Sequence, residues 1–158
     1  MIFVTIGAQE PFERLVQAID QIAPTLGGIP IVAQISKSSF QPKHMQVHEF
    51  LSPSMYTKYF NKATLIVSHA GMGTIISALV QQKPILVFPR LAKYGETRND
   101  HQVSTAKVFE KLEYITAAYS EEELELKLKL LLQASMHNGS KIGKYASPDL
   151  IKSLKGEL

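Results

Sequence analysis

Short runs of apolar, often β-branched residues alternate with amphipathic stretches along most of the sequence. Six runs have the length and composition of strands buried on both faces: 2–6, 30–35, 45–50, 65–68, 84–89 and 114–118. Strands that alternate with helices form βα units, and such units build a parallel sheet. We therefore predict an α/β fold, a Rossmann-like parallel sheet of about six strands with helices on both faces.

Capping residues and apolar spacing predict where the helices lie. The first follows Pro11, which has the place of a first helical residue, and carries apolar side chains at helical spacing over 12–22. The others are 52–62 with Ser52 or Ser54 as cap, 74–82, a helix from Asn99 or Asp100 to about Lys111, and a last helix begun by the capping box of Ser120 and Glu123.

Length and composition exclude several classes of protein. With 158 residues we expect one domain, 1–158, with a modestly basic tail from about residue 139. An apolar content of 45% and a net charge of +3 argue against disorder, and the absence of cysteine excludes disulfides and thiolate sites. The start Met-Ile-Phe-Val-Thr-Ile has no basic leader, and no apolar run is long enough to span a bilayer. We expect a cytosolic protein.

The basic residues are scattered instead of forming one patch with interleaved aromatic residues, which argues against nucleic-acid binding. In the last predicted helix, Glu123 and Lys127 are four residues apart, and so are Glu125 and Lys129. This spacing predicts solvated ion pairs on one helix.

Ligands of open parallel sheets bind beyond the carboxyl ends of the strands, where the loops 7–10, 69–73 and 90–100 are expected. The turn Ser-His-Ala-Gly-Met-Gly-Thr at 68–74 leads from a strand into a helix, and its free amides suit a phosphate. A tight βα turn without a ligand explains the glycines equally well. A dinucleotide fingerprint is incomplete because Ile76 stands where the third glycine belongs, and no P-loop occurs.

The segment 90–102 is unusually polar and ends in Asp100, His101 and Gln102. A carboxylate, an imidazole and an amide in succession can read sugar hydroxyls, which donate and accept hydrogen bonds at once. Asp100 as a simple helix cap, with the next two residues on the surface, is the alternative. A metal site of His69, Asp100 and His101 lacks a known ligand spacing.

These residues resemble the family 28 glycosyltransferase C-terminal domain. The resemblance is carried by the turn at 68–74, by Lys83-Pro84 leading a strand to Pro89-Arg90, and by Asn-Asp-His-Gln at 99–102. The opening Phe-Val-Thr-Ile-Gly at 3–7 resembles the short, stand-alone members, which are Alg13-like subunits and exopolysaccharide subunits of the EpsF/PssE type. Lys-Tyr-Gly-Glu at 93–96 is similar to the bacterial branch.

The resemblance implies the C-terminal half of a GT-B glycosyltransferase, which binds a UDP-sugar without a metal or other cofactor. Carried over by position, the implied substrate-binding residues are Gly7 in the cleft, Gly71, Gly73 and Thr74 at the diphosphate, Arg90 near the base, and Asp100, His101 and Gln102 near the sugar, with His69 as a further one. Relatives often hold the ribose with a glutamate where Ser77 stands here, so ribose binding would use a weaker group or Glu96.

The resemblance also implies a partner. A GT-B site lies between two domains, so we expect a membrane-anchored subunit to supply the general base and a lipid-linked acceptor at the cytoplasmic face of the membrane. This chain alone would bind donor but transfer little. The alternatives are a non-catalytic nucleotide-binding or regulatory module, an NAD or flavin enzyme, and a homodimer with a shared site.

Overall fold

The computed structural model describes residues 1–7 and 10–138. In chain order its elements are β1 (Ile2–Thr5), α1 (Glu13–Ile22), η1 (Ala23–Thr25), β2 (Ile31–Gln34), β3 (Gln46–His48), α2 (Pro53–Lys62), β4 (Leu65–Ser68), α3 (Met72–Val80), β5 (Ile85–Val87), η2 (Ala92–Tyr94), α4 (His101–Lys111), β6 (Thr116–Ala117) and α5 (Glu121–Asn138).

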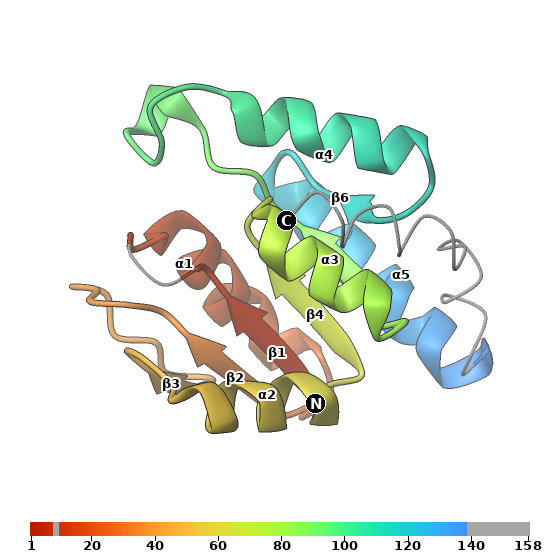
Figure 1. Ribbon diagram of the computed structural model, residues 1–158. Coiled ribbons are helices and arrows are strands. Elements are labelled where there is room, and N and C mark those ends of the chain that lie inside the picture. The colour runs from red at the N-terminus through yellow and green to blue at the C-terminus, as the bar shows by residue number, and fades with distance from the viewer. Residues whose placement is uncertain (8–9, 139–158) are drawn as a thin grey trace.

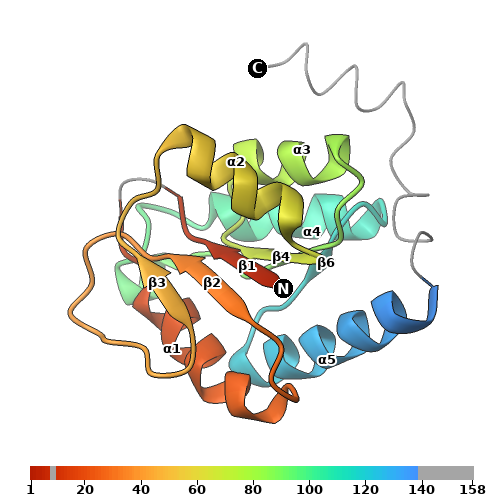
Figure 2. The same cartoon turned by 90° about the horizontal axis from the view of Figure 1, so that it is seen from below.

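The strands form one parallel sheet in the order β3-β2-β1-β4-β5-β6. Seen from below, α2, α3 and α4 cover one face and α1 and α5 cover the other (Figures 1 and 2). The predicted Rossmann-like sheet of six strands is therefore confirmed. The chain order reverses between β1 and β4, and ligands of such sheets bind beyond the carboxyl ends at this point.

Each face of the sheet has its own apolar core, and β1 supplies both. Ile2 and Val4 face α1 and α5, whereas Phe3 faces α2, α3 and α4. All residues of β1, β2 and β4 are buried, as expected for strands covered on both sides. Two packed faces fix the strand register, and with it the positions of the loops at the carboxyl edge.

Two predicted helix starts are wrong by two residues. Pro11 is not the first helical residue, because α1 begins at Glu13 with Phe12 as its N-cap. The helix predicted from Thr74 begins instead at Met72, which puts Gly73 inside the first turn of α3. Glycine is a poor helix former, so a pattern read residue by residue puts the boundary too late.

The caps predicted for α2 and α5 are confirmed. Ser52 Oγ accepts a hydrogen bond from the Met55 amide at 3.3 Å, and Ser120 Oγ accepts one from the Glu123 amide at 3.2 Å. The Glu123 carboxylate bonds the Tyr119 amide, one residue before the N-cap.

The predicted ion pairs on α5 form, at 3.5 Å for Lys127–Glu123 and 2.7 Å for Lys129–Glu125. The basic tail expected from about residue 139 lies outside the described residues. No helix among residues 1–7 and 10–138 has the length and apolar character needed to cross a membrane.

Candidate functional site

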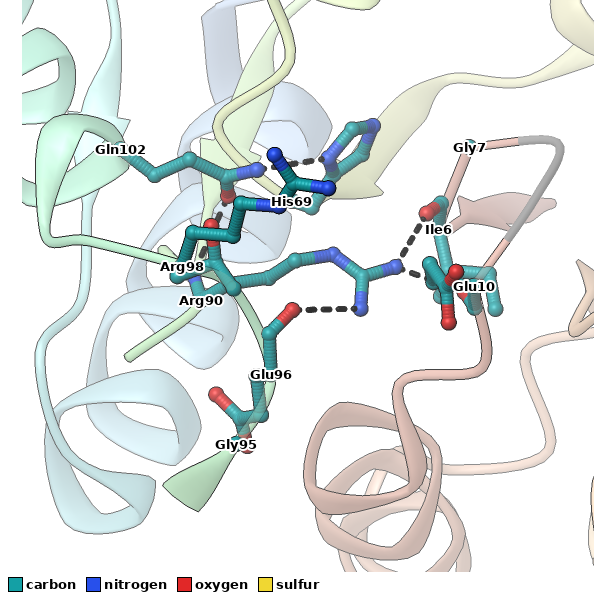
Figure 3. Close-up of a pocket in the computed structure, with 10 residues that line it drawn as sticks. Ile6, Gly7, Glu10, His69, Arg90, Gly95, Glu96, Arg98 and Gln102 are labelled. Atoms are coloured by element: carbon teal, nitrogen blue, oxygen red, sulfur yellow. Dashed lines mark hydrogen bonds between the residues drawn. The ribbon is translucent and has the colours of Figure 1, made fainter. Parts of the chain in front are cut away.

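A cavity of about 660 Å³ opens beyond the carboxyl ends of β1, β4 and β5. Its walls come from the β1–α1 loop, the β4–α3 turn, the segment after β5 and the start of α4 (Figure 3). The lining residues are Ile6, Gly7, Glu10, His69, Arg90, Gly95, Glu96, Thr97, Arg98 and Gln102. We call it the polar cavity.

The Gln102 side chain joins the two turns that the sequence singles out. Its Oε1 accepts hydrogen bonds from the Ala70 amide at 3.2 Å and the Arg90 amide at 3.1 Å. Both donors are backbone N–H groups, so the amide oxygen must face them. The turns near residues 71 and 100 therefore lie together beside one cavity, at the carboxyl ends of the strands where ligand loops are predicted.

This orientation of Gln102 determines which ring nitrogen of His69 carries the hydrogen. The Gln102 Nε2 faces His69 Nδ1 at 3.4 Å, and an amide nitrogen can only donate (Figure 3). Nδ1 is then the acceptor and Nε2 carries the hydrogen. Burial, together with the nearby Arg90 charge, lowers the pKa of His69 to about 4. The ring is neutral at physiological pH and offers one N–H donor.

Two glycines make room for this ring. A Cβ on Gly71 would lie 2.3 Å from His69 Cε1, and a Cβ on Gly7 would lie 3.1 Å from His69 Nε2. Gly7 also has a φ of +86°, a conformation that other residues rarely adopt. The imidazole thus requires a small residue at both positions, and the backbone conformation favours glycine at Gly7 as well.

The first turn of α3 presents unpaired amides next to His69. The N-cap is Gly71, which has no side chain to accept from these amides, and the first turn carries no acidic residue. The N–H groups of Met72, Gly73 and Thr74 thus lack helical partners, at the end of the helix that carries partial positive charge. Ser77 is exposed one turn beyond Gly73.

Arg90 lines the polar cavity, and its side chain joins the β1–α1 loop to the segment after β5. It is only 5% exposed, and its guanidinium donates to the carbonyl oxygens of Ile6 and Glu10 at 2.8 Å and of Glu96 at 3.5 Å (Figure 3). It also donates to the Pro11 carbonyl oxygen at 2.9 Å. The resemblance puts Arg90 beside the base. A guanidinium with these partners could contact a base only by giving up backbone bonds.

Glu96 lines the cavity, but its carboxylate is committed to Arg14. The two groups form a bidentate pair, with Arg14 Nε at 2.8 Å and Nη2 at 3.0 Å, and Glu96 Oε2 also accepts from the Leu91 amide at 2.8 Å. This arrangement argues against the expectation that Glu96 holds the ribose, because its oxygens already have protein partners.

Asp100 and His101 stand at the start of α4, outside the cavity lining. Asp100 occupies the N-cap position, but its side chain does not cap the helix and accepts from the Ala92 amide at 2.9 Å. Asn99 Oδ1 takes the His101 amide instead, at 3.0 Å. Of the two predicted caps, Asn99 bonds the first amide of α4, whereas the Asp100 carboxylate bonds an amide outside the helix.

Half of the predicted substrate-binding residues line the polar cavity. These are Gly7, His69, Arg90, Glu96 and Gln102. The others lie around its rim or on α3: Gly71, Gly73, Thr74, Asp100 and His101. Sequence reasoning did not select Glu10, Gly95, Thr97 or Arg98, although each stands in a predicted ligand loop. Arg98 extends across the cavity toward His69 and forms no ion pair with any described residue (Figure 3).

A second cavity, of about 400 Å³, lies on the other side of Gly7 and was not predicted. Its lining is mostly apolar and comprises Thr5, Gly7, Gln34, Phe50, Leu51, Pro53, Tyr56 and Thr57. We call it the apolar cavity. Phe50 is 53% exposed at its mouth. Gln34 is buried and accepts from the Leu51 amide at 2.8 Å.

One sequence signal marks this edge of the sheet. The last residues of β2, β1 and β4 are Gln34, Thr5 and Ser68, which are polar, buried and paired in register. A polar residue that closes an apolar run points to a polar site at that strand end. Among the described residues no cluster of three or more histidine, aspartate or glutamate side chains could hold a metal ion.

The model of the glycosyltransferase family 28 C-terminal domain matches residues 1–154. The chain is 35% identical over 86 residues to the UDP-N-acetylglucosamine transferase subunit ALG13 of Candida albicans, a match over 54% of this chain and 28% of that protein. It thus spans little more than a quarter of that curated relative.

Solved structures share the fold at low identity. The NMR solution structure of ALG13 has a TM-score of 0.63 and 20% identity, with 97% of this chain and 93% of that chain covered. A UDP-glucose: anthocyanidin 3-O-glucosyltransferase in complex with UDP has a TM-score of 0.66 and 18% identity, with 98% and 35% covered. The sheet order and helix layers of this chain are therefore those of known glycosyltransferase domains.

Proposed function

Because this chain belongs to the family of glycosyltransferase family 28 C-terminal domains, we propose that it binds the nucleotide-sugar donor of an inverting glycosyltransferase. The donor is a UDP-sugar, as the name of the Candida albicans relative and the UDP complex of a structural neighbour suggest. A non-catalytic nucleotide-binding module of the same fold is the alternative.

One observation carries the proposal. The uncapped first turn of α3 and the Nε2–H of His69 lie at the carboxyl edge, where both cavities meet at Gly7. Several N–H donors at a helix start bind a diphosphate well, because the helix dipole and the hydrogen bonds act together. The diphosphate would lie here, bound by Gly71, Gly73 and Thr74.

The two cavities suit the two ends of such a donor. The polar cavity takes the sugar, with Arg98, Thr97 and Glu10 able to bond its hydroxyls and Asp100, His101 and Gln102 beside it. The apolar cavity takes the uracil, which is flat and can rest against Phe50. This assignment moves the base away from Arg90. Ser77, beyond Gly73 on α3, supplies a hydroxyl for the ribose.

The sugar is then transferred from the donor, bound by this chain, to a hydroxyl of the acceptor. A hydroxyl of the acceptor attacks the anomeric carbon, its proton passes to a general base, and the bond from that carbon to the diphosphate oxygen breaks. Negative charge grows on the leaving UDP next to the α3 amides and His69 Nε2–H. These donors are in place before the reaction, so they stabilise the leaving group with little reorganisation.

The acceptor side belongs to a partner in this proposal. A GT-B site needs a second domain across the cleft, which we assign to a membrane-anchored subunit that holds a lipid-linked acceptor and the general base. The product would enter exopolysaccharide or capsule synthesis, and this chain would sit at the cytoplasmic face of the membrane through that partner.

Calorimetric titration with UDP, UDP-sugars, NAD and ATP tests the ligand class. We expect binding of UDP compounds, and at about 100 times Kd a ligand raises the free energy of unfolding by about 2.7 kcal/mol. Gly73→Leu should abolish this binding. Glu122→Leu, at the same position of α5 on the other face of the sheet, should not. Binding of NAD without UDP would contradict the proposal.

Transfer assays test the enzymatic part. We expect sugar transfer to a lipid-extractable product only when the chain is combined with membranes that contain its partner. Transfer by membranes alone at the same rate would mean that this chain is a silent binder. Gly73→Leu serves as the matched inactive subunit.

A further inference from the structure

The segment between β5 and α4, residues 90–98, carries Gly95, Thr97 and Arg98 into the polar cavity. We call it the donor loop. It has one short turn, η2, and its local backbone bonds join Gly95 to Ala92 at 3.0 Å, Tyr94 to Leu91 at 3.2 Å and Glu96 to Leu91 at 3.3 Å. Few internal bonds leave such a loop dependent on contacts from outside for its shape.

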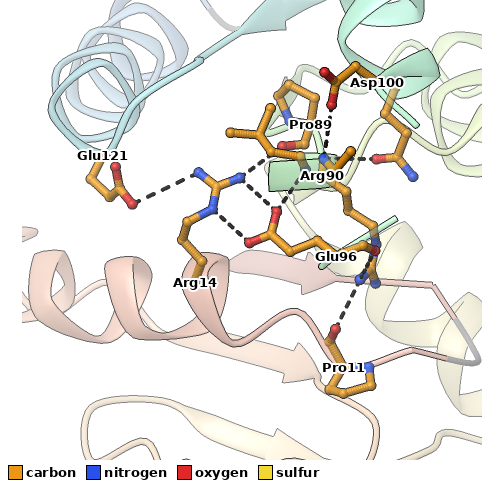
Figure 4. Close-up of polar contacts among 10 residues, drawn as sticks. Pro11, Arg14, Pro89, Arg90, Glu96, Asp100 and Glu121 are labelled. Carbon is orange, nitrogen blue, oxygen red and sulfur yellow. Dashed lines mark hydrogen bonds and ion pairs between the residues drawn. The ribbon is translucent and has the colours of Figure 1, made fainter. Parts of the chain in front are cut away.

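One of those contacts, the ion pair with Arg14, is made by Glu96, which is held at both its backbone and its side chain. Arg90 donates to its carbonyl oxygen, and Arg14 of α1 grips its carboxylate through two bonds (Figure 4). The second carboxylate oxygen also closes the loop by accepting from the Leu91 amide at 2.8 Å. One side chain thus joins the donor loop to itself and to α1.

Arg14 is placed for this task, outside the lining of the polar cavity. Its side chain is only 14% exposed, and Glu96 is 11% exposed. The guanidinium lies 4.2 Å from the ring centre of Phe88, donates to the Pro89 carbonyl at 3.0 Å, and approaches Glu121 of α5 at 3.9 Å (Figure 4).

A largely buried bidentate pair of this kind is stronger than an exposed one, because solvent screens it less and two bonds fix its geometry. Lysine cannot replace it, since an ammonium neither forms the two parallel bonds nor stacks in the same way on Phe88. The pair therefore holds the donor loop in one conformation.

We propose that Arg14, acting through Glu96, is a positioning residue that presents Thr97 and Arg98 to the donor. This inference rests on the proposed function. The same inference separates two roles for Glu96. In one role its carboxylate stays paired with Arg14 and supports the loop; in the other the carboxylate gives up Arg14 and binds the ribose. The roles predict opposite behaviour when Arg14 is removed.

The experiment compares Arg14→Met, Glu96→Gln and the double variant in the full chain, with UDP-N-acetylglucosamine and UDP as probes. If Arg14 positions the loop, each single change weakens binding by about tenfold, because the loop must then be ordered on binding. The double variant is no weaker than either single variant, because one interaction is lost in all three. If Glu96 binds the ribose instead, Arg14→Met leaves affinity unchanged or improves it, and the inference is overturned.

Hydrogen exchange of the donor loop amides without ligand supplies an independent readout. We expect faster exchange over residues 91–98 in Arg14→Met and in the milder Arg14→Lys, with β1 and β4 unchanged. Lys129→Met, which breaks an exposed pair on α5, is the matched control and should change neither exchange nor affinity. Unchanged loop exchange in both Arg14 variants refutes the inference, whereas failure of the wild type to bind UDP compounds refutes the proposed function.

Discussion

The loop that leads from β1 into α1 and the turn that leads from β4 into α3 stand on neighbouring strands, but they show opposite backbone polarity. The first turns its carbonyl oxygens inward, where Ile6, Glu10 and Pro11 all accept from Arg90. The second presents the amides of the α3 start, with no side-chain cap. The β1–α1 loop thus binds the cationic side chain of Arg90, whereas the β4–α3 turn can bind an anion.

The starts of the two helices differ in the same sense. Glu13 occupies the first turn of α1, and its pKa lies below the ordinary value because Ser39 and Ser38 hydrogen-bond the carboxylate. The first turn of α3 has no acidic residue. A carboxylate near a helix start satisfies the dipole internally. Of the two helices, only α3 thus has an N-terminus whose amides are open to an anionic ligand.

The largest expected effect is on stability, from removing the cation that holds the β1–α1 loop. Arg90→Met leaves carbonyl oxygens from both sides of the cavity without donors, which costs about 2–5 kcal/mol. The free energy of unfolding from urea denaturation measures this. Arg90→Lys, which keeps the charge but fewer bonds, should fall in between. A loss below about 0.5 kcal/mol would mean that the loop holds itself.

The next effect concerns pH and the turn into α3. The folded pKa of His69, about 4, lies below its ordinary value of 6.5, so the unfolded chain binds the proton first as pH falls. Stability from this group is present above pH 6.5 and is lost as pH falls toward 4, by at most about 3 kcal/mol. Unfolding at several pH values measures the slope, and His69→Asn should flatten it.

A smaller effect, on binding, distinguishes the two glycines of the same turn. Gly71→Ala pushes against the His69 ring and should weaken UDP binding at least tenfold, about 1.4 kcal/mol. A Cβ on Gly73 meets nothing within 4 Å, so Gly73→Ala should fold at least as stably as the wild type. Calorimetry gives the affinities, and the imidazole resonances report any movement of the ring. Equal affinities of the wild type and Gly71→Ala for UDP would mean that His69 takes no part in binding.

The smallest change would make α3 resemble α1. Thr74→Glu puts a carboxylate in the first turn of α3, which should stabilise the fold by about 0.3–1 kcal/mol and weaken UDP binding. Thr74→Gln is the uncharged control and should do less of both. Tighter UDP binding to Thr74→Glu would refute the idea that this helix end is reserved for an anion.

The fold and the convergence of the two turns could be predicted because they depend on local patterns. Apolar runs and caps identify strands and helices, and parallel strands bring their carboxyl ends to one edge. Gly71 and Gln102 are far apart in sequence but follow from that rule. The start of α3 was missed because the glycine at position 73 reads as a turn residue although it lies within the helix.

The roles of the charged residues could not be predicted in the same way. Arg90 and Glu96 look like ligand-binding groups in a polar loop, yet one is bound by carbonyl oxygens and the other by Arg14. Their partners lie on α1 and the loop before it, and no local spacing connects these segments. The apolar cavity was missed for a related reason, since its walls come from β1, β2 and the start of α2.

The place of β1 in the sheet has a consequence for biosynthesis. This strand lies between β2 and β4, so one of its edges has no partner until residues 65–68 have left the ribosome. Until then Ile2, Val4 and the rest of a mostly apolar strand present an open edge, which can pair with other nascent chains. The rate at which the segment between β1 and β4 is made and released should therefore govern how much of the protein escapes aggregation.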